Sequence, residues 1–410
     1  LLPYNRHVRI LLSAYSFGAW RGSEAGVGWN VAKGLAERGH EVTVLTTSEF
    51  HDINTKGIAE TGGKIKLLEW DADIAPEDYP KAKSYRRWQS RVGAYLKQVC
   101  AEGGFDLVHH VTFNQYRNLK DVFSAGLPYV VGPVGGAETV AACLLKDLPA
   151  KMRAKELLRR LPWDALPLAW RVQNCRKRGV ILTSTPGTKA RLEQVGVRNV
   201  QLNPIIAIPA AEIQEDAPEV DAEPFMVFYG GGARPEKGTL LLVRSLVRLW
   251  NQGCRVPVRV VAVAEPLRPG ILAYAAQQGL PAEAMEFVPF MPRTELMALM
   301  RRSRAFLTLN FRDDGCMALL EAVAMGIPSV CLDIPSQFWL PEEYATKVSI
   351  RPGHVEDDLA QAMRQAVDAP AKGASWHARR VQWLRETMSW ETRISQLEEY
   401  YRGLLTSDKA

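Results

Sequence analysis

Residues 305–332 read AFLTLNFRDDGCMALLEAVAMGIPSVCL and form a complete strand–helix–strand unit. Residues 305–309 are a short apolar run typical of a buried strand, and residues 329–332 are another. Residues 316–325, between them, have the pattern of a helix. Strand–helix–strand alternation with short connections predicts a parallel, doubly wound α/β sheet.

The same alternation extends on both sides of this unit. In the first half we expect helices at 27–37 and 81–100, and strands at 8–14, 41–46, 65–70, 105–109, 127–131 and 180–184. In the second half we expect further strands at 226–229, 256–264 and 284–288, and helices at 238–251, 293–302, 355–368 and 376–405. Residues 209–224 interrupt the pattern, because they are acidic and contain three prolines. We therefore predict two Rossmann-like domains, 1–208 and 225–388, joined by a linker at 209–224.

The composition is that of an ordinary globular protein. The 410 residues are 47% hydrophobic and 23% charged, which excludes wholesale disorder. No uncharged apolar run reaches the roughly 18 residues of a transmembrane helix. The six cysteines are scattered without the spacing of a metal site, so we expect reduced thiols, no bound metal and a cytoplasmic location.

The net charge of +6 is concentrated in two segments. Residues 81–97 contain six basic residues and no acid, and residues 146–178 contain ten basic residues and three acids. The second segment also carries Trp163, Trp170 and six leucines, a combination that suits an anionic membrane surface better than nucleic acid. We therefore consider 81–98 and 146–178 as contacts with the inner face of a membrane. The alternative is a pair of solvated helices whose apolar sides face the core.

Ligands of open parallel sheets bind beyond the carboxyl ends of the strands, so the loops there are the candidate sites. The glycine-rich loop 15–29 leads into a helix and includes Gly22, but its spacing fits a dinucleotide fingerprint poorly. The loop 230–238 combines glycines, among them Gly232, with Arg234 and Lys237. Such a loop suits a phosphate group, and a tight turn with exposed charges is the alternative.

Residues 310–328 begin with a loop and continue into the predicted helix. Asp313 lies in the loop, and Glu321 lies inside the helix. A buried carboxylate needs hydrogen-bonding partners, which the hydroxyls of a ribose would provide. The backbone N–H groups at Gly315, Cys316 and Met317 begin the helix and suit a phosphate. His110, at the end of a strand in the first half, is a candidate for substrate contact or a structural histidine.

The stretch from Asp313 to Pro328 resembles the E-x7-E segment of GT-B glycosyltransferases of the group 1 (family 4) type. Residues 235–238 resemble the donor-phosphate loop of that family, and 389–391 resemble the start of its closing helix. The resemblance covers nearly the whole chain. Residues 22–29 and 132–138 are similar to a subgroup concerned with cell-surface polysaccharides.

This resemblance implies two domains facing across a cleft, with the helix 390–406 crossing back to the first domain. The first domain would bind the acceptor, a glycan or lipid-linked molecule, and the second a nucleotide diphosphate sugar, with no other cofactor and no metal. It implies a retaining sugar transfer. By the same resemblance Lys237 would neutralise the diphosphate, Asp313 would hold the donor sugar, Glu321 would hold the ribose and Gly22 would approach the phosphates.

Three positions depart from the pattern of the family. Asp313 replaces a glutamate, and Gly232 stands where an arginine is expected, with Arg234 nearby as its substitute. No histidine matches the catalytic-side histidine, for which His110 is the nearest candidate. Two alternatives stay open: a GT-B binding or scaffold subunit without turnover, and a GT-B nucleotide-sugar epimerase.

Overall fold

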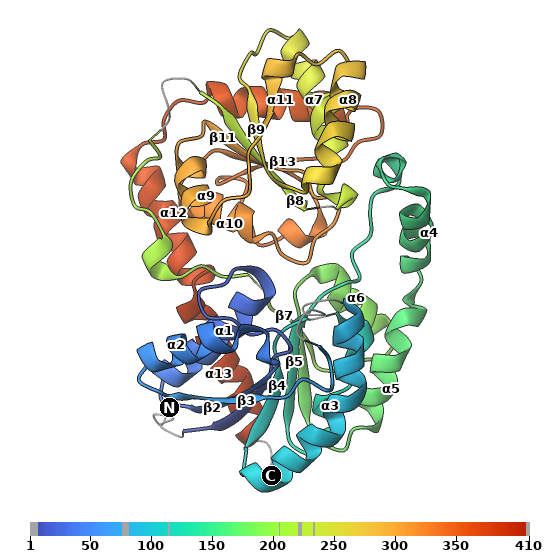
Figure 1. Cartoon of the computed structure of the whole chain (residues 1–410), viewed down its shortest axis with the longest axis vertical. Coiled ribbons are helices and arrows are strands. Elements are labelled where there is room, and N and C mark those ends of the chain that lie inside the picture. The colour runs from blue at the N-terminus through green and yellow to red at the C-terminus, as the bar shows by residue number, and fades with distance from the viewer. Residues whose placement is uncertain are drawn as a thin grey trace. The chain divides into compact units, whose positions relative to one another are not determined.

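The computed structural model describes residues 7–75, 82–113, 115–204, 206–219, 224–232 and 234–406. The chain forms two compact units (Figure 1). The first unit comprises Leu1–Ala137, Leu161–Ala207 and Trp390–Ala410, and the second comprises Glu138–Arg160 and Ile208–Ser389.

The first unit is built on a seven-stranded sheet in which every strand pairs in parallel. The strand order is β3-β2-β1-β4-β5-β6-β7. The strands are β1 (Arg9–Ser13), β2 (Glu41–Thr46), β3 (Ile65–Glu69), β4 (Leu107–His110), β5 (Tyr129–Val134), β6 (Gly179–Thr183) and β7 (Val200–Leu202). The central strands β1, β4 and β5 are almost entirely buried because helices cover both faces of the sheet.

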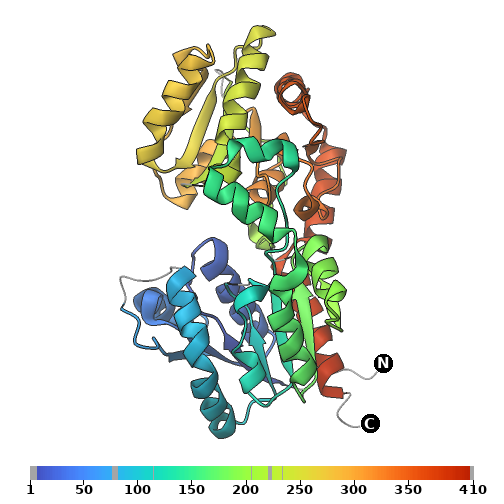
Figure 2. The ribbon, with the colours of Figure 1, turned by 90° about the vertical axis from the view of Figure 1, so that its right-hand side faces the viewer.

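Alternate residues of β1 contact different helices. Ile10 and Leu12 belong to the core that includes α1 (Ser23–Glu37) and α13 (Trp390–Thr406). Leu11 points to the opposite face and belongs to the core that includes α3 (Ala82–Gly103). Figure 2 shows α3 in cyan and α13 in red on the two sides of this sheet. The remaining helices of the unit are α2 (His51–Glu60), α5 (Leu166–Asn174) and α6 (Pro186–Gln194).

The second unit contains a six-stranded parallel sheet in the order β10-β9-β8-β11-β12-β13. The strands are β8 (Met226–Gly232), β9 (Val258–Val263), β10 (Met285–Phe287), β11 (Ala305–Thr308), β12 (Ser329–Leu332) and β13 (Thr346–Val348). Its helices are α4 (Ala150–Arg159), α7 (Thr239–Asn251), α8 (Arg268–Gln277), α9 (Arg293–Arg301), α10 (Met317–Ala324), α11 (Val355–Asp368) and α12 (Ala374–Thr387). The prediction of two Rossmann-like parallel sheets is confirmed.

One segment lies in a different unit from the one the sequence predicted. Glu138–Arg160 is encoded between β5 and β6, but it packs in the second unit. Leu144 and Leu148 are buried there in the same core as α7 and α11. The cause is the apolar side of this segment, which removes two leucines from water when it packs on the second unit.

Short or weakly patterned elements were not predicted from the sequence. Among them are β7, β13, α2, α6 and α8, which are three-residue strands or helices of nine or ten residues. Residues 220–223 of the predicted linker lie outside the described residues. None of the helices in the described ranges has the length and apolarity needed to cross a membrane.

Candidate functional site

The second sheet reverses its winding between β8 and β11. These strands are neighbours, and the chain proceeds from β8 toward β9 on one side and from β11 toward β12 on the other. Such a switch point is where open α/β sheets bind ligands, because the two loops that leave it diverge. The loop after β8 carries Lys237 and the loop after β11 carries Asp313.

Lys237 and Asp313 form an ion pair across these two loops. The Lys237 Nζ donates to Asp313 Oδ2 at 2.8 Å, and their side chains are 7% and 17% exposed. Asn310 Nδ2 donates to the same carboxylate oxygen. The other oxygen, Oδ1, accepts from the backbone N–H groups of Asp314 at 2.9 Å and Gly315 at 3.3 Å. The structure therefore brings together the two residues that the resemblance assigned to the diphosphate and the donor sugar.

Glycines make this close approach of the loops geometrically feasible. Gly231 has a φ of +58°, and a Cβ at this position would lie 2.7 Å from the side chain of Lys237. Gly238 has a φ of +80°, and its Cβ would lie 2.4 Å from the carbonyl oxygen of Leu309. Only glycine tolerates both restrictions at low cost. Gly231 was not among the predicted site residues, although it lies within the glycine run that suggested the loop.

The predicted phosphate-binding groups lie around this pair. Gly232 is exposed with a φ of +81° and has no atom within 4 Å of a Cβ built on it. Arg234 is exposed, and its Nε donates to the Gly231 carbonyl at 3.3 Å. Cys316 precedes α10, which begins at Met317, so the positive end of this helix dipole lies next to Asp313. Burial raises the pKa of the Cys316 thiol, which keeps it neutral.

Glu321 lies on α10 and has a protein partner that the sequence did not predict. Its Oε1 accepts from Arg293 Nε at 3.1 Å and Nη2 at 2.7 Å. Arg293, at the start of α9, also donates to both carboxylate oxygens of Glu212. Burial raises the pKa of Glu321, and Arg293 opposes that change. A ribose is therefore not needed to satisfy the buried carboxylate, because a guanidinium does so.

Tyr229, near the end of β8, is a further residue of the site that the sequence did not single out. Burial raises the pKa of its hydroxyl, and the nearby Cys316 and Glu321 raise it further. Tyr229 thus lies within electrostatic range of groups on the loop after β11 and on α10. A polar aromatic residue at a strand end is the only signal in the sequence that could have indicated it.

The histidines at the end of β4 are in a different environment. His110 is fully buried, its Nδ1 donates to Asp121 Oδ2 at 2.7 Å, and its Nε2 contacts the Tyr85 hydroxyl at 3.3 Å. His109 is also fully buried, between the Tyr401 hydroxyl and the Gly132 carbonyl. Both rings have the surroundings of structural histidines, which was the alternative considered for His110.

Gly22 is the predicted site residue of the first unit that is accessible. It is exposed, occupies the N-cap position of α1, and has no atom within 4 Å of a Cβ built on it. Its approach to donor phosphates stays a prediction. Among the residues that the structure describes, no cluster of three or more His, Cys, Asp or Glu side chains could hold a metal ion.

Comparison with known proteins finds a family that resembles most of the second unit. Residues 211–381 match the model of the family described as glycosyl transferases group 1. No curated protein matches the sequence. The matched residues include Lys237, Asp313 and Glu321.

Solved structures resemble the chain along nearly its whole length. A sucrose-phosphate synthase from Thermosynechococcus elongatus has 15% identity and a TM-score of 0.67, covering 98% of this chain and 100% of the other. A glycosyltransferase from Rickettsia africae has 13% identity and a TM-score of 0.66, covering 98% and 99%. Anabaena HepE, solved in complex with UDP and glucose, has 14% identity and a TM-score of 0.61, covering 97% and 100%.

At identities this low, the solved structures show only that the folds agree, and the family match adds a likeness of residues 211–381 to one family. Both agree with the resemblance drawn from Asp313–Pro328. Residues 211–381 are therefore similar to the group 1 glycosyl transferases, and the chain as a whole has the GT-B fold.

Proposed function

We propose that this protein transfers a sugar from a nucleotide diphosphate sugar, with retention of configuration and without a bound metal, to a lipid-linked or polysaccharide acceptor in cell-surface glycan synthesis. The observation that supports it most is the Lys237–Asp313 pair at the switch point of a group 1 domain. An ammonium group held there is ready to neutralise a departing diphosphate, which is a main source of rate enhancement in such transfers.

The pair also accounts for how the site is kept ordered before the donor arrives. Lys237 and Asp313 neutralise each other at 2.8 Å, so neither buried charge is left without a partner. When a donor binds, Lys237 turns part of its hydrogen-bonding capacity to the diphosphate, and Asp313 accepts from hydroxyls of the donor sugar. The positive end of α10 and the exposed Arg234 add to the field on the phosphates.

Glu321 and Arg293 would act together on the ribose of the donor. The Glu321 carboxylate has one oxygen, Oε1, in contact with Arg293, which leaves Oε2 to accept from ribose hydroxyls. A hydrogen bond to a charged group contributes about 1.5 to 3 kcal/mol, which corresponds to roughly 10- to 150-fold in affinity.

A thermal-shift screen of the whole protein against UDP-, GDP-, ADP- and TDP-sugars tests the donor assignment. We expect one nucleotide class to raise the melting temperature, because a ligand that binds only the folded state stabilises it. The matched Glu321→Gln variant should weaken that shift. If none of the four nucleotide classes shifts the melting temperature at millimolar concentration, the donor assignment is wrong.

The same preparation separates transfer from mere binding. A transferase produces a glycoside whose anomeric configuration, read by NMR, matches that of the donor, and the rate survives EDTA. A binding or scaffold subunit would bind the donor without product, and an epimerase would convert the donor sugar with no acceptor present. The burial of His109 and His110 gives the subunit alternative some support, because neither ring reaches solvent.

We also propose that the protein binds peripherally to an anionic membrane surface, where its acceptor would lie. Residues 81–98 and 146–178 are the two candidate contacts with that surface. The apolar residues of α3, including Trp88 and Val92, are buried in the first unit, so that helix presents mainly its charges. In the second segment the large apolar side chains are instead more than half exposed: Leu157, Leu158, Leu161, Trp163, Leu166 and Trp170. Exposed Trp and Leu beside basic residues favour the second segment as the membrane contact.

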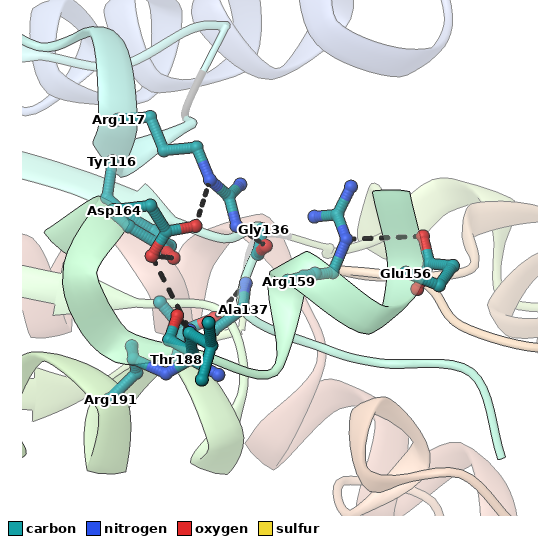
Figure 3. Close-up of polar contacts among 10 residues, drawn as sticks. Tyr116, Arg117, Gly136, Ala137, Glu156, Arg159, Asp164, Thr188 and Arg191 are labelled. Carbon is teal, nitrogen blue, oxygen red and sulfur yellow. Dashed lines mark hydrogen bonds and ion pairs between the residues drawn. The ribbon is translucent and has the colours of Figure 1, made fainter. Parts of the chain in front are cut away.

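Polar contacts hold part of this segment on the first unit. Asp164 accepts from the Tyr116 hydroxyl at 2.8 Å, from Arg117 Nε and from Arg191 Nη1 at 3.4 Å (Figure 3). Its neighbour Trp163 is 56% exposed. The chain is thus anchored through Asp164 while apolar side chains beside it face solvent.

Flotation with vesicles of anionic phosphatidylglycerol tests the membrane contact. We expect the protein to float with these vesicles and the Trp163→Ser/Trp170→Ser variant to stay behind. An Arg86→Ser/Arg87→Ser variant of α3 is the matched control and should float like the parent protein. Absence of binding at moderate salt would remove the membrane from the proposal while leaving the donor assignment intact.

A further inference from the structure

The segment Glu138–Arg160 is fastened to the second unit at two places. Shortly before α4, the Asp147 carboxylate accepts from Arg244 Nη1 at 2.9 Å and from Nη2 at 2.7 Å. Arg244 lies on α7, and Leu144 and Leu148 are buried beside this contact in the core of the unit. The first attachment therefore combines a bidentate ion pair between Asp147 and Arg244 with the burial of two leucines.

The second fastening is Glu156 on α4, whose side chain is 3% exposed. Its Oε1 accepts from Arg159 Nε at 3.2 Å, which Figure 3 shows, and from Arg312 Nε at 3.0 Å. Its Oε2 accepts from the backbone N–H of Val140 at 3.3 Å. A carboxylate this deeply buried is stable only with such partners, so Arg312 is held firmly.

Arg312 in turn connects the two loops of the candidate site. It immediately precedes Asp313, and its Nη2 lies 3.7 Å from Oε1 of Glu236, which immediately precedes Lys237. The backbone N–H of Phe311 also donates to the Glu236 carbonyl at 2.8 Å. Glu156, Arg312 and Glu236 therefore form a chain of ion pairs beside the Lys237–Asp313 pair. In each loop, a residue of this chain immediately precedes a residue of the pair.

We propose that Glu156 is a positioning residue for the donor site. By fixing the Arg312 guanidinium it sets the spacing of the two loops, and with it the geometry of Lys237 and Asp313. The inference rests on the proposed function, in which those two residues hold the donor. A segment encoded between two strands of the first sheet then determines how tightly the second unit binds a nucleotide sugar.

The test compares two variants of the whole protein. Glu156→Gln removes the charge that holds Arg312, and Asp147→Asn weakens the other fastening of the same segment, away from the loops. The dissociation constant for the nucleotide sugar selected by the thermal-shift screen is measured by calorimetry, together with the melting temperature. We expect Glu156→Gln to weaken donor binding about 3- to 30-fold, the range found for residues that act on a site through others. Asp147→Asn should lower the melting temperature and leave donor affinity unchanged.

The outcomes separate the inference from the function on which it rests. If the parent protein binds no nucleotide sugar, the proposed function fails first. If the parent binds and Glu156→Gln binds equally well, or if both variants weaken binding equally, the positioning role is overturned. Should Glu156→Gln not fold, Arg312→Gln examines the same link from the loop, with the same expected weakening, and unchanged affinity overturns the inference.

Discussion

The two sheets have the same winding, and each has charged or titratable residues at its switch point. In the first unit, Ser13 ends β1 and His110 ends β4, and both contact Asp121. In the second unit, Lys237 follows β8 and Asp313 follows β11, and they contact each other. All three residues of the first group are completely buried, whereas the side chains of Lys237 and Asp313 are 7% and 17% exposed.

The difference in exposure gives the two groups different roles. Burial works to raise the pKa of Asp121, but His110 and Ser13 outweigh it, and the pKa falls below its usual range. Because water and ligands cannot reach this group, its interactions stabilise the folded state and nothing else. Lys237 and Asp313 form an equally close pair, but they can exchange a partner for a ligand. The position of a group at a switch point therefore does not tell whether its role is functional or structural. Whether a ligand can reach the group does.

The largest expected effect is on the buried group. Asp121→Ala leaves the imidazole of His110 and the hydroxyl of Ser13 without their shared partner, which should cost about 3 to 5 kcal/mol of unfolding free energy. Urea titration measures this loss. The affinity of the folded variant for the donor should not change. A folded variant that binds the donor more weakly would contradict the purely structural role of the Asp121 group.

Lys237→Ala should have the opposite profile. Removing a donor aimed at the charge that develops on the leaving group should lower kcat about 100- to 1,000-fold. Stability should change little by comparison, because Asp313 keeps Asn310 and two backbone N–H partners. Transfer rates and urea titration on the same samples measure both quantities. A normal rate would show that the accessible pair is structural after all.

The smallest effect concerns pH and His109, the other fully buried histidine at this edge. Burial lowers its pKa to about 4, against roughly 6.5 in the unfolded chain. Between these values the unfolded state binds more protons, so stability falls as pH decreases, by up to about 1.4 kcal/mol per pH unit. His109→Gln can keep both hydrogen bonds, with the Tyr401 hydroxyl and the Gly132 carbonyl, and should flatten this dependence. Urea titration from pH 7 to pH 4.5 measures it; an unchanged slope would exclude His109 as the cause.

Much of the fold could be predicted because central strands of doubly wound sheets are apolar on both faces. β2 and β12 were predicted at their observed bounds. The loops that carry Lys237 and Asp313 were also predicted correctly to follow the carboxyl ends of strands. The approach of those two loops followed from the topology of parallel sheets. The glycines that permit it were visible as a run, although the role of Gly231 was not.

Other features depend on contacts between residues distant in sequence, which no local pattern records. Arg293 and Glu321 are 28 residues apart, and the start of α9 gave no sign that its first residue would satisfy a carboxylate on α10. Glu138–Arg160 looked like part of the first half because it lies between two of its strands. His110 appeared to be at an accessible strand end, but Tyr85 from α3 and Asp121 from a later loop enclose it.

The chain passes between the two units at four junctions, since three segments form the first unit and two form the second. This has a consequence for protein engineering. A chimera made by exchanging everything after the linker would combine the Leu144 and Leu148 of one parent with the α7 of the other. Donor specificity should transfer between related enzymes only when residues 138–160 travel with the later segment, as a double graft.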